Sequence, residues 1–428
     1  MNLLVKNGKM IDRHNDLIET DLWIEGMNIK AIGVDLATNL TTFDKIIDVK
    51  GGLITPGLVD VHVHFREPGF THKETIETGS QAAARGGYTT VCAMPNLNPV
   101  PDTVARFEEV EAIIQKDAVV KVLQYAPITE ELKSETLVDM AGMKAAGAFA
   151  FTNDGVGVQT AGTMYLAMTE AAKVGLPIVA HTEDESLLFG GCMHRGKVSE
   201  KLGLPGIMSA TESSQIARDL ILAEETGVHY HVCHLSTKES VRIIREAKQA
   251  GVHVTCEVCP HHLIMSEEDI THDHGNFKMN PPLRSTADRE ALINGLLDGT
   301  IDCIATDHAP HSHQEKNQSM VDSPFGIVGS ETAFALMYTE FVEKGIFTLE
   351  QVIEWMTIKP AEIFSLQTGK IRVGGLADIA VFNLTESYQI DSQDFQSKSS
   401  NTPFIGKAVK GQTILTLVNG QIAWSEGE

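Results

Sequence analysis

The segment Leu58-Val59-Asp60-Val61-His62-Val63-His64-Phe65-Arg66-Glu67-Pro68-Gly69 joins a short apolar run to a cluster of polar side chains. The apolar run is typical of a buried β-strand. Because side chains on a strand alternate between its two faces, His62, His64 and Arg66 are expected to point the same way. Two imidazoles on one face can hold a metal ion, and a guanidinium beside them can bind a carboxylate. Such a pair can also be ordinary core or surface histidines, so the interpretation depends on the rest of the chain.

Similar apolar runs recur along the middle of the chain at intervals of mostly about 30 residues. Helical stretches separate them, and two of these, 74–85 and 210–226, are followed by glycine, as helices often are. This alternation over about eight units predicts an α/β fold, a (β/α)8 barrel of the TIM type. An open doubly wound sheet is the alternative, but no glycine-rich dinucleotide-binding motif begins any unit. The expected strands are Leu58–His64, Tyr88–Met94, Val120–Ala126, Ala148–Thr152, Pro177–His181, His229–Leu235, Val252–Val258 and Ile301–Thr306.

The two ends of the chain resemble each other. Leu4–Met10 near the start is echoed by Leu417–Ile422 near the finish, and each contains Asn-Gly between apolar residues. That pattern predicts a two-residue hairpin at both ends. We therefore expect a small β-sandwich domain made from both termini, residues 1–55 and 367–428, around a catalytic barrel at 56–366.

The chain is strongly acidic, with 57 acidic and 34 basic side chains and a formal charge of −23. This balance argues against binding to nucleic acid or an anionic membrane, although local cations can still attract a small anionic substrate. No apolar run approaches the length of a membrane span and the N-terminus lacks signal-peptide architecture, so we expect a cytoplasmic protein. Six scattered cysteines agree with a reducing compartment. Cys256 and Cys259 have CxxC spacing but are expected to pack in the core.

Polar side chains follow most of the expected strands. Catalytic residues of barrel enzymes lie at the C-terminal ends of strands, so these side chains should converge on one mouth. Imidazoles and carboxylates together form a ligand set for one or two divalent ions, with zinc favoured. Each residue alone has an ordinary explanation as a core histidine, a turn or a helix cap, but all of these would have to hold at once. The strand-end residues are His62, His64, Arg66, Asn96, Asp154, His181, His234 and Asp307.

These motifs resemble the amidohydrolase superfamily, whose barrel carries His-x-His on strand 1, histidines on strands 5 and 6, and aspartate on strand 8. More narrowly, the chain resembles bacterial type I dihydroorotases over almost its whole length, including both ends of the β-domain. The segments that carry the resemblance are His62–Gly69, Met94–Asn96, Asp154-Gly155, His181–Asp184, His234–Thr237, Asn280–Arg284 and Thr306–His311.

The resemblance implies six metal ligands, and one of them, Asp307, is also the implied proton shuttle. The ligands are His62, His64 and Asp307 for the more buried ion, His181 and His234 for the second, and Asp154 as the bridge. The implied substrate contacts are Arg66, Asn96 and His311 at the carboxylate, with His64, Asn280 and the backbone at Phe325 and Gly326 around the ring.

One feature departs from many members of the superfamily. Hydantoinases and others bridge their metals with a carbamylated lysine on strand 4, whereas Gly147–Thr152 contains no lysine and Lys144 lies too early. Asp154 is the available bridge, which favours the type I dihydroorotase pattern. One or two zinc ions are expected per subunit, with two favoured.

Four further histidines lie near the predicted ligands. We expect His261, His262 and His313 not to bind metal, because the ligand set is already complete. His308 would point away from its neighbour Asp307 on a continuing strand and would support the site from behind.

The implied activity is the reversible opening of dihydroorotate to N-carbamoyl-aspartate, whose reverse is a step of pyrimidine biosynthesis. The polar segment 311–322 has the composition of a mobile loop that could close over the site. Two alternatives stay open: allantoinase or another cyclic-amide hydrolase, and a non-catalytic relative kept for assembly with another enzyme. The expected partners are the small anionic substrate, a second copy in a homodimer, and aspartate carbamoyltransferase.

Overall fold

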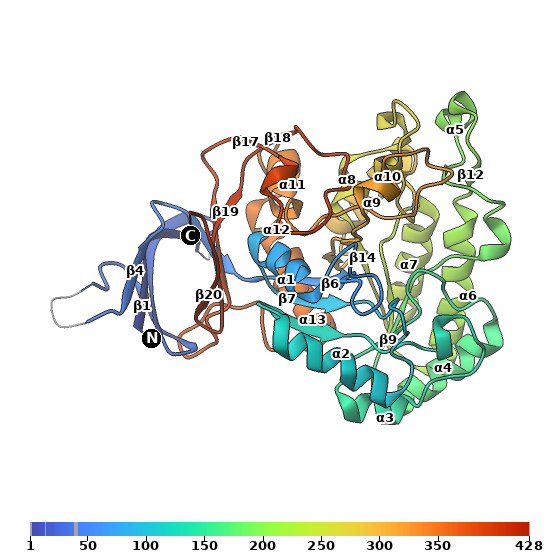
Figure 1. Ribbon diagram of the computed structural model, residues 1–428, viewed down its shortest axis with the longest axis horizontal. Coiled ribbons are helices and arrows are strands. Elements are labelled where there is room, and N and C mark those ends of the chain that lie inside the picture. The colour runs from blue at the N-terminus through green and yellow to red at the C-terminus, as the bar shows by residue number, and fades with distance from the viewer. Residues whose placement is uncertain (1, 13, 38–41, 428) are drawn as a thin grey trace.

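Eight parallel strands form a closed barrel in the computed structural model, which describes residues 2–12, 14–37 and 42–427 (Figure 1). They pair as a five-stranded sheet, β15-β14-β13-β10-β9, and a three-stranded sheet, β6-β7-β8. Parallel bridges from Ala126 to Phe151 and from Val63 to His308 join the two sheets at both seams, which confirms the predicted barrel. The strands are β6 (Leu58–Val63), β7 (Tyr88–Ala93), β8 (Lys121–Gln124), β9 (Phe151–Thr152), β10 (Ile178–Ala180), β13 (Tyr230–Val232), β14 (Val254–Val258) and β15 (Cys303–Ile304).

Helices cover the outside of the barrel, and their ends follow local capping signals. α6 ends at Thr226, as predicted, because Gly227 adopts φ +69 there. α1 begins two residues later than predicted, because the Thr75 side chain accepts a hydrogen bond from Thr78 N and caps it. The helices are α1 (Ile76–Arg85), α2 (Val104–Asp117), α3 (Met140–Ala146), α4 (Ala161–Val174), α5 (Lys197–Leu202), α6 (Ala210–Thr226), α7 (Lys238–Ala250), α8 (Pro260–Ile264), α9 (Thr286–Leu297), α10 (His313–Lys316), α11 (Ala333–Met337), α12 (Leu349–Met356) and α13 (Ile358–Ile363).

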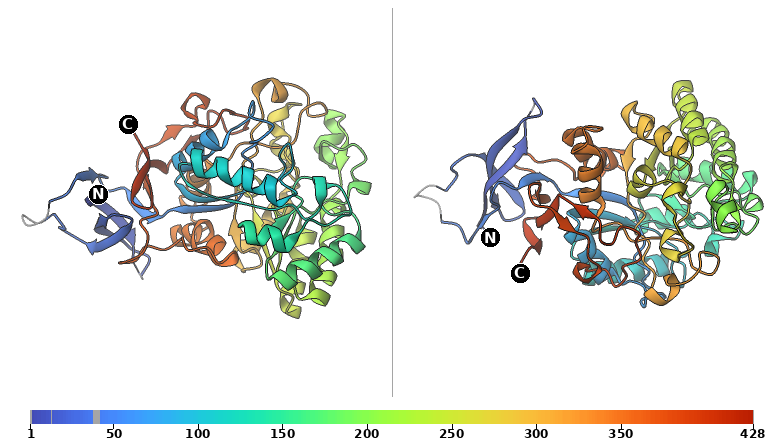
Figure 2. Two further views of the ribbon diagram at one scale, coloured as in Figure 1. Left: turned by 60° about the horizontal axis from the view of Figure 1, so that its bottom comes forward. Right: turned by 90° about the horizontal axis from the view of Figure 1, so that it is seen from above.

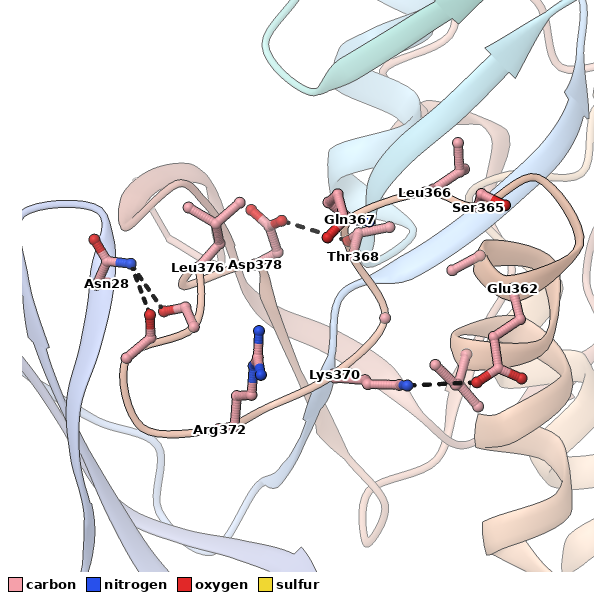
Figure 3. A pocket seen from close by; sticks show the side chains of 15 residues that line it. Asn28, Glu362, Ser365, Leu366, Gln367, Thr368, Lys370, Arg372, Leu376 and Asp378 are labelled. Atoms are coloured by element: carbon pink, nitrogen blue, oxygen red, sulfur yellow. Dashed lines mark hydrogen bonds and ion pairs between the residues drawn. The ribbon is translucent and has the colours of Figure 1, made fainter. Parts of the chain in front are cut away.

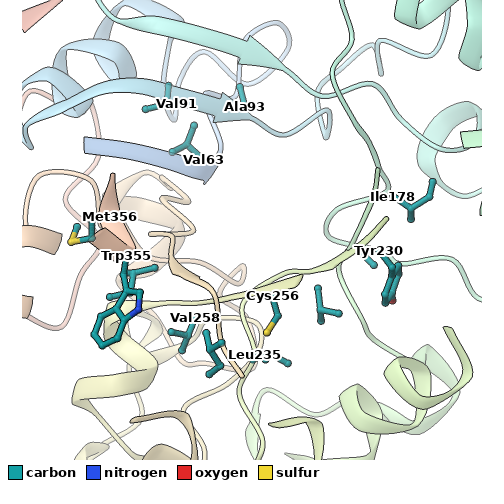
Figure 4. Packing of buried hydrophobic residues seen from close by; sticks show 14 of the residues in the cluster. Val63, Val91, Ala93, Ile178, Tyr230, Leu235, Cys256, Val258, Trp355 and Met356 are labelled. Carbon is teal, nitrogen blue, oxygen red and sulfur yellow. The ribbon is translucent and has the colours of Figure 1, made fainter. Parts of the chain in front are cut away.

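Apolar side chains fill the space between the strands and the surrounding helices (Figure 4). Val63, Tyr230 and Val258 come from three different strands, and Trp355 comes from α12. Every residue of β6 is buried, as expected for a parallel strand covered on both faces. All six cysteines are buried and free, which confirms the expected packing of Cys256 and Cys259 in the core.

Both ends of the chain build a second sheet beside the barrel, at the left of Figure 1. Its core unites Leu22 of β2 with Leu417 of β19, although these strands are far apart in the sheet order β20-β19-β16-β5-β1-β2-β3. The sheet therefore folds over its own apolar face, like a small sandwich. The exact domain limits drawn from the sequence stay a proposal. The strands are β1 (Asn2–Ile11), β2 (Leu17–Glu25), β3 (Asn28–Gly33), β4 (Lys45–Asp48), β5 (Leu53–Pro56), β16 (Ile379–Asn383), β19 (Gln412–Val418) and β20 (Gln421–Ser425).

The two Asn-Gly pairs behave differently. Asn419 and Gly420 have φ 49 and φ 72 and connect antiparallel β19 and β20, so the predicted hairpin is confirmed there. The hairpin predicted at Asn7-Gly8 is wrong, because β1 continues through it with a register shift that marks a bulge. Packing explains the difference: a Cβ on Gly8 would lie 2.2 Å from the Ile54 side chain, so this glycine permits a close approach of two strands.

A loop after α13 joins the barrel to the terminal sheet and lines a cavity of about 530 Å³ (Figure 3). Asn28 donates to the carbonyl oxygens of Gly374 and Gly375, and Lys370 lies 3.4 Å from Glu362. None of the predicted site residues lines this cavity. It is therefore a feature of the domain junction.

The chain between β16 and β19 leaves the terminal sheet and crosses the barrel through β17 (Tyr388–Gln389) and β18 (Ala408–Val409), which lie beside α11 (Figures 1 and 2). Glu331 accepts hydrogen bonds from Gln396 N and Ser397 N and so ties this segment to the barrel. In the described residues, no helix combines the length and apolar character needed to cross a bilayer.

Phe382 is predicted to be important for stability because it packs the terminal sheet against the barrel. It is fully buried on β16 and stacks on Phe334 of α11, with ring centroids 3.8 Å apart. Phe382→Ala should lower the free energy of unfolding by about 3–5 kcal/mol, because it leaves a cavity. Denaturant titration measures this loss. Phe189→Ala is the control, because this side chain is 74% exposed; equal effects of the two substitutions would contradict the packing argument.

Candidate metal centre

Three predicted ligands meet at the seam between the first and last barrel strands. His62 lies on β6, His64 follows it, and Asp307 follows β15. Asp307 Oδ1 lies 3.0 Å from His64 Nε2 and 3.4 Å from His62 Nε2. All three side chains are buried, and their donor atoms are close enough to share one cation.

A second group lies beside the first. His181 follows β10 and His234 follows β13, and their facing nitrogens, Nδ1 and Nε2, are 3.0 Å apart. Asp154 Oδ1 lies 3.7 Å from His181 Nδ1 and 3.8 Å from His234 Nε2. The same oxygen lies 3.3 Å from His62 Nε2, so the Asp154 carboxylate lies between the two groups.

The donor set fits one or two divalent ions. His62 Nε2 and Asp154 Oδ1 are buried and have no hydrogen-bond partner among the described residues. Leaving buried polar atoms unpaired costs free energy, and a bound cation would remove that cost. Imidazole nitrogen and carboxylate oxygen are ligands that zinc accepts readily.

Neighbouring side chains fix how the first two imidazoles face. Glu257 Oε1 lies 2.7 Å from His62 Nδ1, and Asn96 Oδ1 lies 2.9 Å from His64 Nδ1. Because each oxygen accepts a hydrogen bond from Nδ1–H, the Nε2 lone pair of each ring is left for a metal. Glu257 also approaches His231 Nε2 at 3.2 Å, so it is itself held in place.

The backbone of the centre is unusual at three strand ends. Arg66, His234 and Asp307 adopt φ 61, φ 31 and φ 50, although none is glycine. Such left-handed conformations cost free energy and persist where the surrounding structure enforces them. The sequence predicts that Arg66 points toward the site because it lies on the same strand face as His62 and His64. In the structure β6 ends at Val63, and a turn directs Arg66 toward the site instead.

Opposite charges control the ionisation of the centre. Burial opposes a charge on His62, but carboxylates nearby, Asp154 above all, raise its pKa well above the ordinary value. Burial also opposes ionised Asp154 and Asp307, yet His62 holds the pKa of both carboxyl groups well below their usual range. Without a metal ion, a proton on His62 thus compensates the two ionised carboxylates. A divalent cation bound at His62 Nε2 would displace that proton and take over the compensation of charge.

The predicted carboxylate-binding residues lie together beside the centre. Arg66 is only 9% exposed and donates from Nε to Pro310 O, while its Nη2 lies 3.4 Å from His311 Nε2. His311 Nε2 also lies 2.8 Å from Phe325 O, so it carries the hydrogen and donates to that carbonyl. Two donors therefore face each other at Arg66 and His311, an arrangement that an anion would stabilise.

The other predicted substrate residues are also close to the mouth. Asn280 donates from Nδ2 to Glu183 Oε2 at 2.6 Å, and Glu183 Oε1 lies 3.8 Å from His181 Nε2. Gly326 donates from its backbone N to Lys278 O, which joins the segment of Phe325 to the segment of Asn280. The structure thus brings these two segments side by side.

Several neighbouring residues have other surroundings. His308 points toward Glu74, whose Oε2 lies 3.5 Å from its Nε2. His313 is exposed on α10 and Lys144 lies on α3. His261, His262 and Cys259 place donor atoms within 4.8 Å of one another, and the expectation that the two histidines do not bind metal stays a prediction.

Sequence reasoning missed the residues that support the centre. Glu257 was read only as part of a buried strand, although a charged residue inside an apolar run was a usable signal. Lys73 was not considered, yet its Nζ lies 3.1 Å from His311 Nδ1 and 3.0 Å from Glu315. Cys233 lies next to His234 and places its sulfur near His62 and Asp154.

Comparison with known proteins identifies the family of this chain. A family model described as dihydro-orotase-like matches residues 51–240. The dihydroorotase of Enterococcus faecalis is 68% identical over 100% of this chain and 99% of its own length, and that of Staphylococcus epidermidis is 57% identical over 99% of each. An L-hydantoinase structure from Arthrobacter aurescens superposes with a TM-score of 0.88 at 27% identity, covering 100% of this chain and 97% of its own. The chain belongs to the dihydroorotase family.

Proposed function

We propose that this chain is a dihydroorotase, which hydrolyses dihydroorotate reversibly to N-carbamoyl-L-aspartate and serves pyrimidine biosynthesis in the ring-closing direction. The observation that carries the proposal is the buried Arg66 guanidinium, which faces His311 beside a cluster of buried metal-ligand types. A site with this arrangement suits a ring that carries both a hydrolysable amide and a carboxylate. Full-length relatives named dihydroorotase support the same activity.

We further propose that the centre holds zinc, with two ions favoured over one. His62, His64 and Asp307 would hold the first ion, His181 and His234 the second, and Asp154 would bridge them. When bound, such ions supply Lewis acidity, which polarises a carbonyl group and lowers the pKa of water.

The chain's own residues then bind the substrate and move protons. Arg66 would hold the ring carboxylate through its N–H donors, and His311 would join it by turning its Nε2–H from Phe325 O to the carboxylate. The free amide hydrogens of Asn96 would add to them, because its Oδ1 is already taken by His64. Asn280, with His64 and the backbone at Phe325-Gly326, orients the ring. Asp307 Oδ accepts a proton from the attacking water and gives it to the departing ring nitrogen. In the reverse direction the same carboxylate returns the proton, which allows ring closure.

Two other functions are less well supported. Allantoinase, or hydrolysis of another cyclic amide, does not require the buried Arg66 guanidinium beside His311. Strand β9, moreover, carries Phe151 and Thr152 and has no lysine that could become carbamylated. A non-catalytic role in assembly is disfavoured because the predicted ligand types are present and grouped.

We propose a cytoplasmic homodimer that can associate with aspartate carbamoyltransferase. Leu166 on α4 is 55% exposed and Ile221 on α6 is 68% exposed, and both would be buried if these neighbouring helices formed the contact between the two copies. The substrate partner is a small anion.

The substrate class is tested by comparing three rings on one metal-replete sample. Dihydroorotate should be opened far faster than allantoin or hydantoin, because only dihydroorotate carries the carboxylate that Arg66 binds. The ring-opening rates and the metal content should be measured on the same preparation. Failure to turn over dihydroorotate by protein with full metal content would refute the proposed function.

Asp307→Asn tests the proton shuttle. The amide keeps an oxygen ligand but cannot accept a proton, so kcat for dihydroorotate should fall by at least about 100-fold. Metal content, measured by elemental analysis, should remain. Asp298→Asn is the control, since this side chain pairs with Arg245 at the surface. Near-normal turnover by Asp307→Asn would remove Asp307 from the shuttle role.

Glu257→Gln tests the support of the metal centre. The substitution keeps the shape but removes the charge that orients His62, so metal affinity should fall by about 10–100-fold. Competition with a chromophoric chelator measures this affinity once thermal melting shows a folded variant. Glu362→Gln is the matched control, because this side chain is exposed on α13 and pairs with Lys370. Unchanged affinity in Glu257→Gln would show that Glu257 does not orient His62.

A further inference from the structure

Lys316 is a lysine whose charged end is buried next to the predicted substrate site. It is the last residue of α10, within the polar segment after the eighth barrel strand, and its side chain is only 1% exposed. Its Nζ donates to three backbone carbonyl oxygens, those of Lys278 at 2.9 Å, Pro324 at 2.9 Å and Gly326 at 2.8 Å. An ammonium group has three hydrogens, so this set of acceptors satisfies all of them.

These carbonyls belong to the two backbone segments that carry the predicted ring contacts. Lys278 lies two residues before Asn280, while Pro324 and Gly326 flank Phe325. The Lys316 ammonium therefore connects both segments to each other and to its own loop. Gly326 has a φ of +127, which only glycine adopts readily, and its carbonyl oxygen is one of the three that the ammonium orders.

Asn401, which follows Gly326 in the sequence, donates a hydrogen bond to the same glycine carbonyl. It belongs to the segment between β16 and β19 and is 4% exposed. Its Nδ2 donates to Gly326 O and Ala309 O, both at 3.1 Å, and its Oδ1 accepts from His311 N at 3.1 Å. Gly326 O thus receives hydrogen bonds from Lys316 and Asn401, while Asn401 also holds the backbone of His311.

Burying the charged end of Lys316 costs free energy. Burial, together with the neighbouring cations Lys278, Arg66 and Lys73, lowers the pKa of Lys316 to about 7, although Glu315 opposes this effect. Methionine has a similar length and would avoid the cost of burying a charge. The three carbonyl oxygens offset that cost because all of them accept hydrogen bonds from the same ammonium group. We infer that the lysine keeps these three backbone groups close together.

We propose that Lys316 and Asn401 are positioning residues for substrate binding, which hold the Gly326 backbone and the Asn280 segment in register with Arg66 and His311. The ring and its carboxylate can then be bound at the same time. This inference rests on the proposed function for its substrate. It concerns the binding of the ring, because neither side chain touches a predicted metal ligand.

Lys316→Met in the full-length, metal-replete enzyme tests the proposal. The KM for dihydroorotate should rise by about tenfold or more, with kcat within about threefold of wild type and unchanged metal content. Hydrogen–deuterium exchange should become faster in peptides covering residues 278–280 and 312–326, the segments that Lys316 connects, and stay unchanged elsewhere. Lys344→Met is the control, because Lys344 is exposed and, among the described residues, pairs with Glu340 four residues away and with no other carboxylate.

Asn401→Asp gives a second test that does not depend on Lys316 variants folding. It places an oxygen, in place of the amide nitrogen, against the carbonyls of Ala309 and Gly326, so the same rise in KM is expected with kcat retained. A wild-type KM in a folded Lys316→Met or Asn401→Asp enzyme overturns the proposal. So does faster exchange spread over the whole chain with no selective change at 278–280 and 312–326. If wild type does not act on dihydroorotate, the proposed function fails, and the exchange measurement still decides whether the two residues order this backbone.

Discussion

The structure depends on keeping two ionised carboxylates and four imidazoles together in a buried space. Asp154 and Asp307 repel each other there, and His62 is the shared neighbour that holds the pKa of both carboxyl groups low. Hydrogen bonds from outside the cluster fix its geometry, above all the 2.7 Å contact between Glu257 and His62. Two buried polar atoms, His62 Nε2 and Asp154 Oδ1, still have no hydrogen-bond partner among the described residues. An arrangement of this kind is stable when a cation completes it, which is why the donor set itself argues for metal.

The barrel makes this arrangement possible because it brings residues from distant parts of the sequence to one rim. The seam between β6 and the segment after β15 is closed by the bridge from Val63 to His308, so His64 and Asp307 become neighbours across 243 positions. The left-handed residues at the rim, such as Asp307 with φ 50, redirect side chains that a regular strand would turn elsewhere. Stability from the apolar layer around the strands offsets this local cost.

The features predictable from sequence were those with a local signal. The eight strands were found because each is a short apolar run bounded by turn residues, and α6 was found because Gly227 ends it. The grouping of the strand-end histidines followed from the barrel, since strand ends share one rim. The hairpin predicted at Asn7-Gly8 was wrong because an Asn-Gly pair can form either a hairpin turn or a β-bulge. The close packing of Gly8 against Ile54, which the local sequence does not show, favours the bulge.

The features that could not be predicted are contacts between segments with no common pattern. Asn401 lies 92 positions from Ala309 and 75 from Gly326, in a stretch that the sequence assigned to the terminal β-domain. Lys316 occurs in a polar segment whose composition suggested a mobile loop, yet the structure folds part of it into α10 and buries the lysine. The composition of a segment predicts its average exposure to solvent. It does not predict the burial of one side chain by residues that are distant in the sequence.

Local charge explains how a chain of net charge −23 can bind an anion. Distant surface carboxylates are screened beyond about 8 Å at physiological salt, so the nearest charges decide the affinity. On one side of the proposed pocket these are cations, Arg66 with Lys73 behind His311. On the other side are Asp154 and Asp307, which would repel the substrate carboxylate if their charge were uncompensated. Metal binding and substrate binding would therefore be coupled: a cation held by these carboxylates would remove the repulsion, and the guanidinium could then determine which rings are accepted.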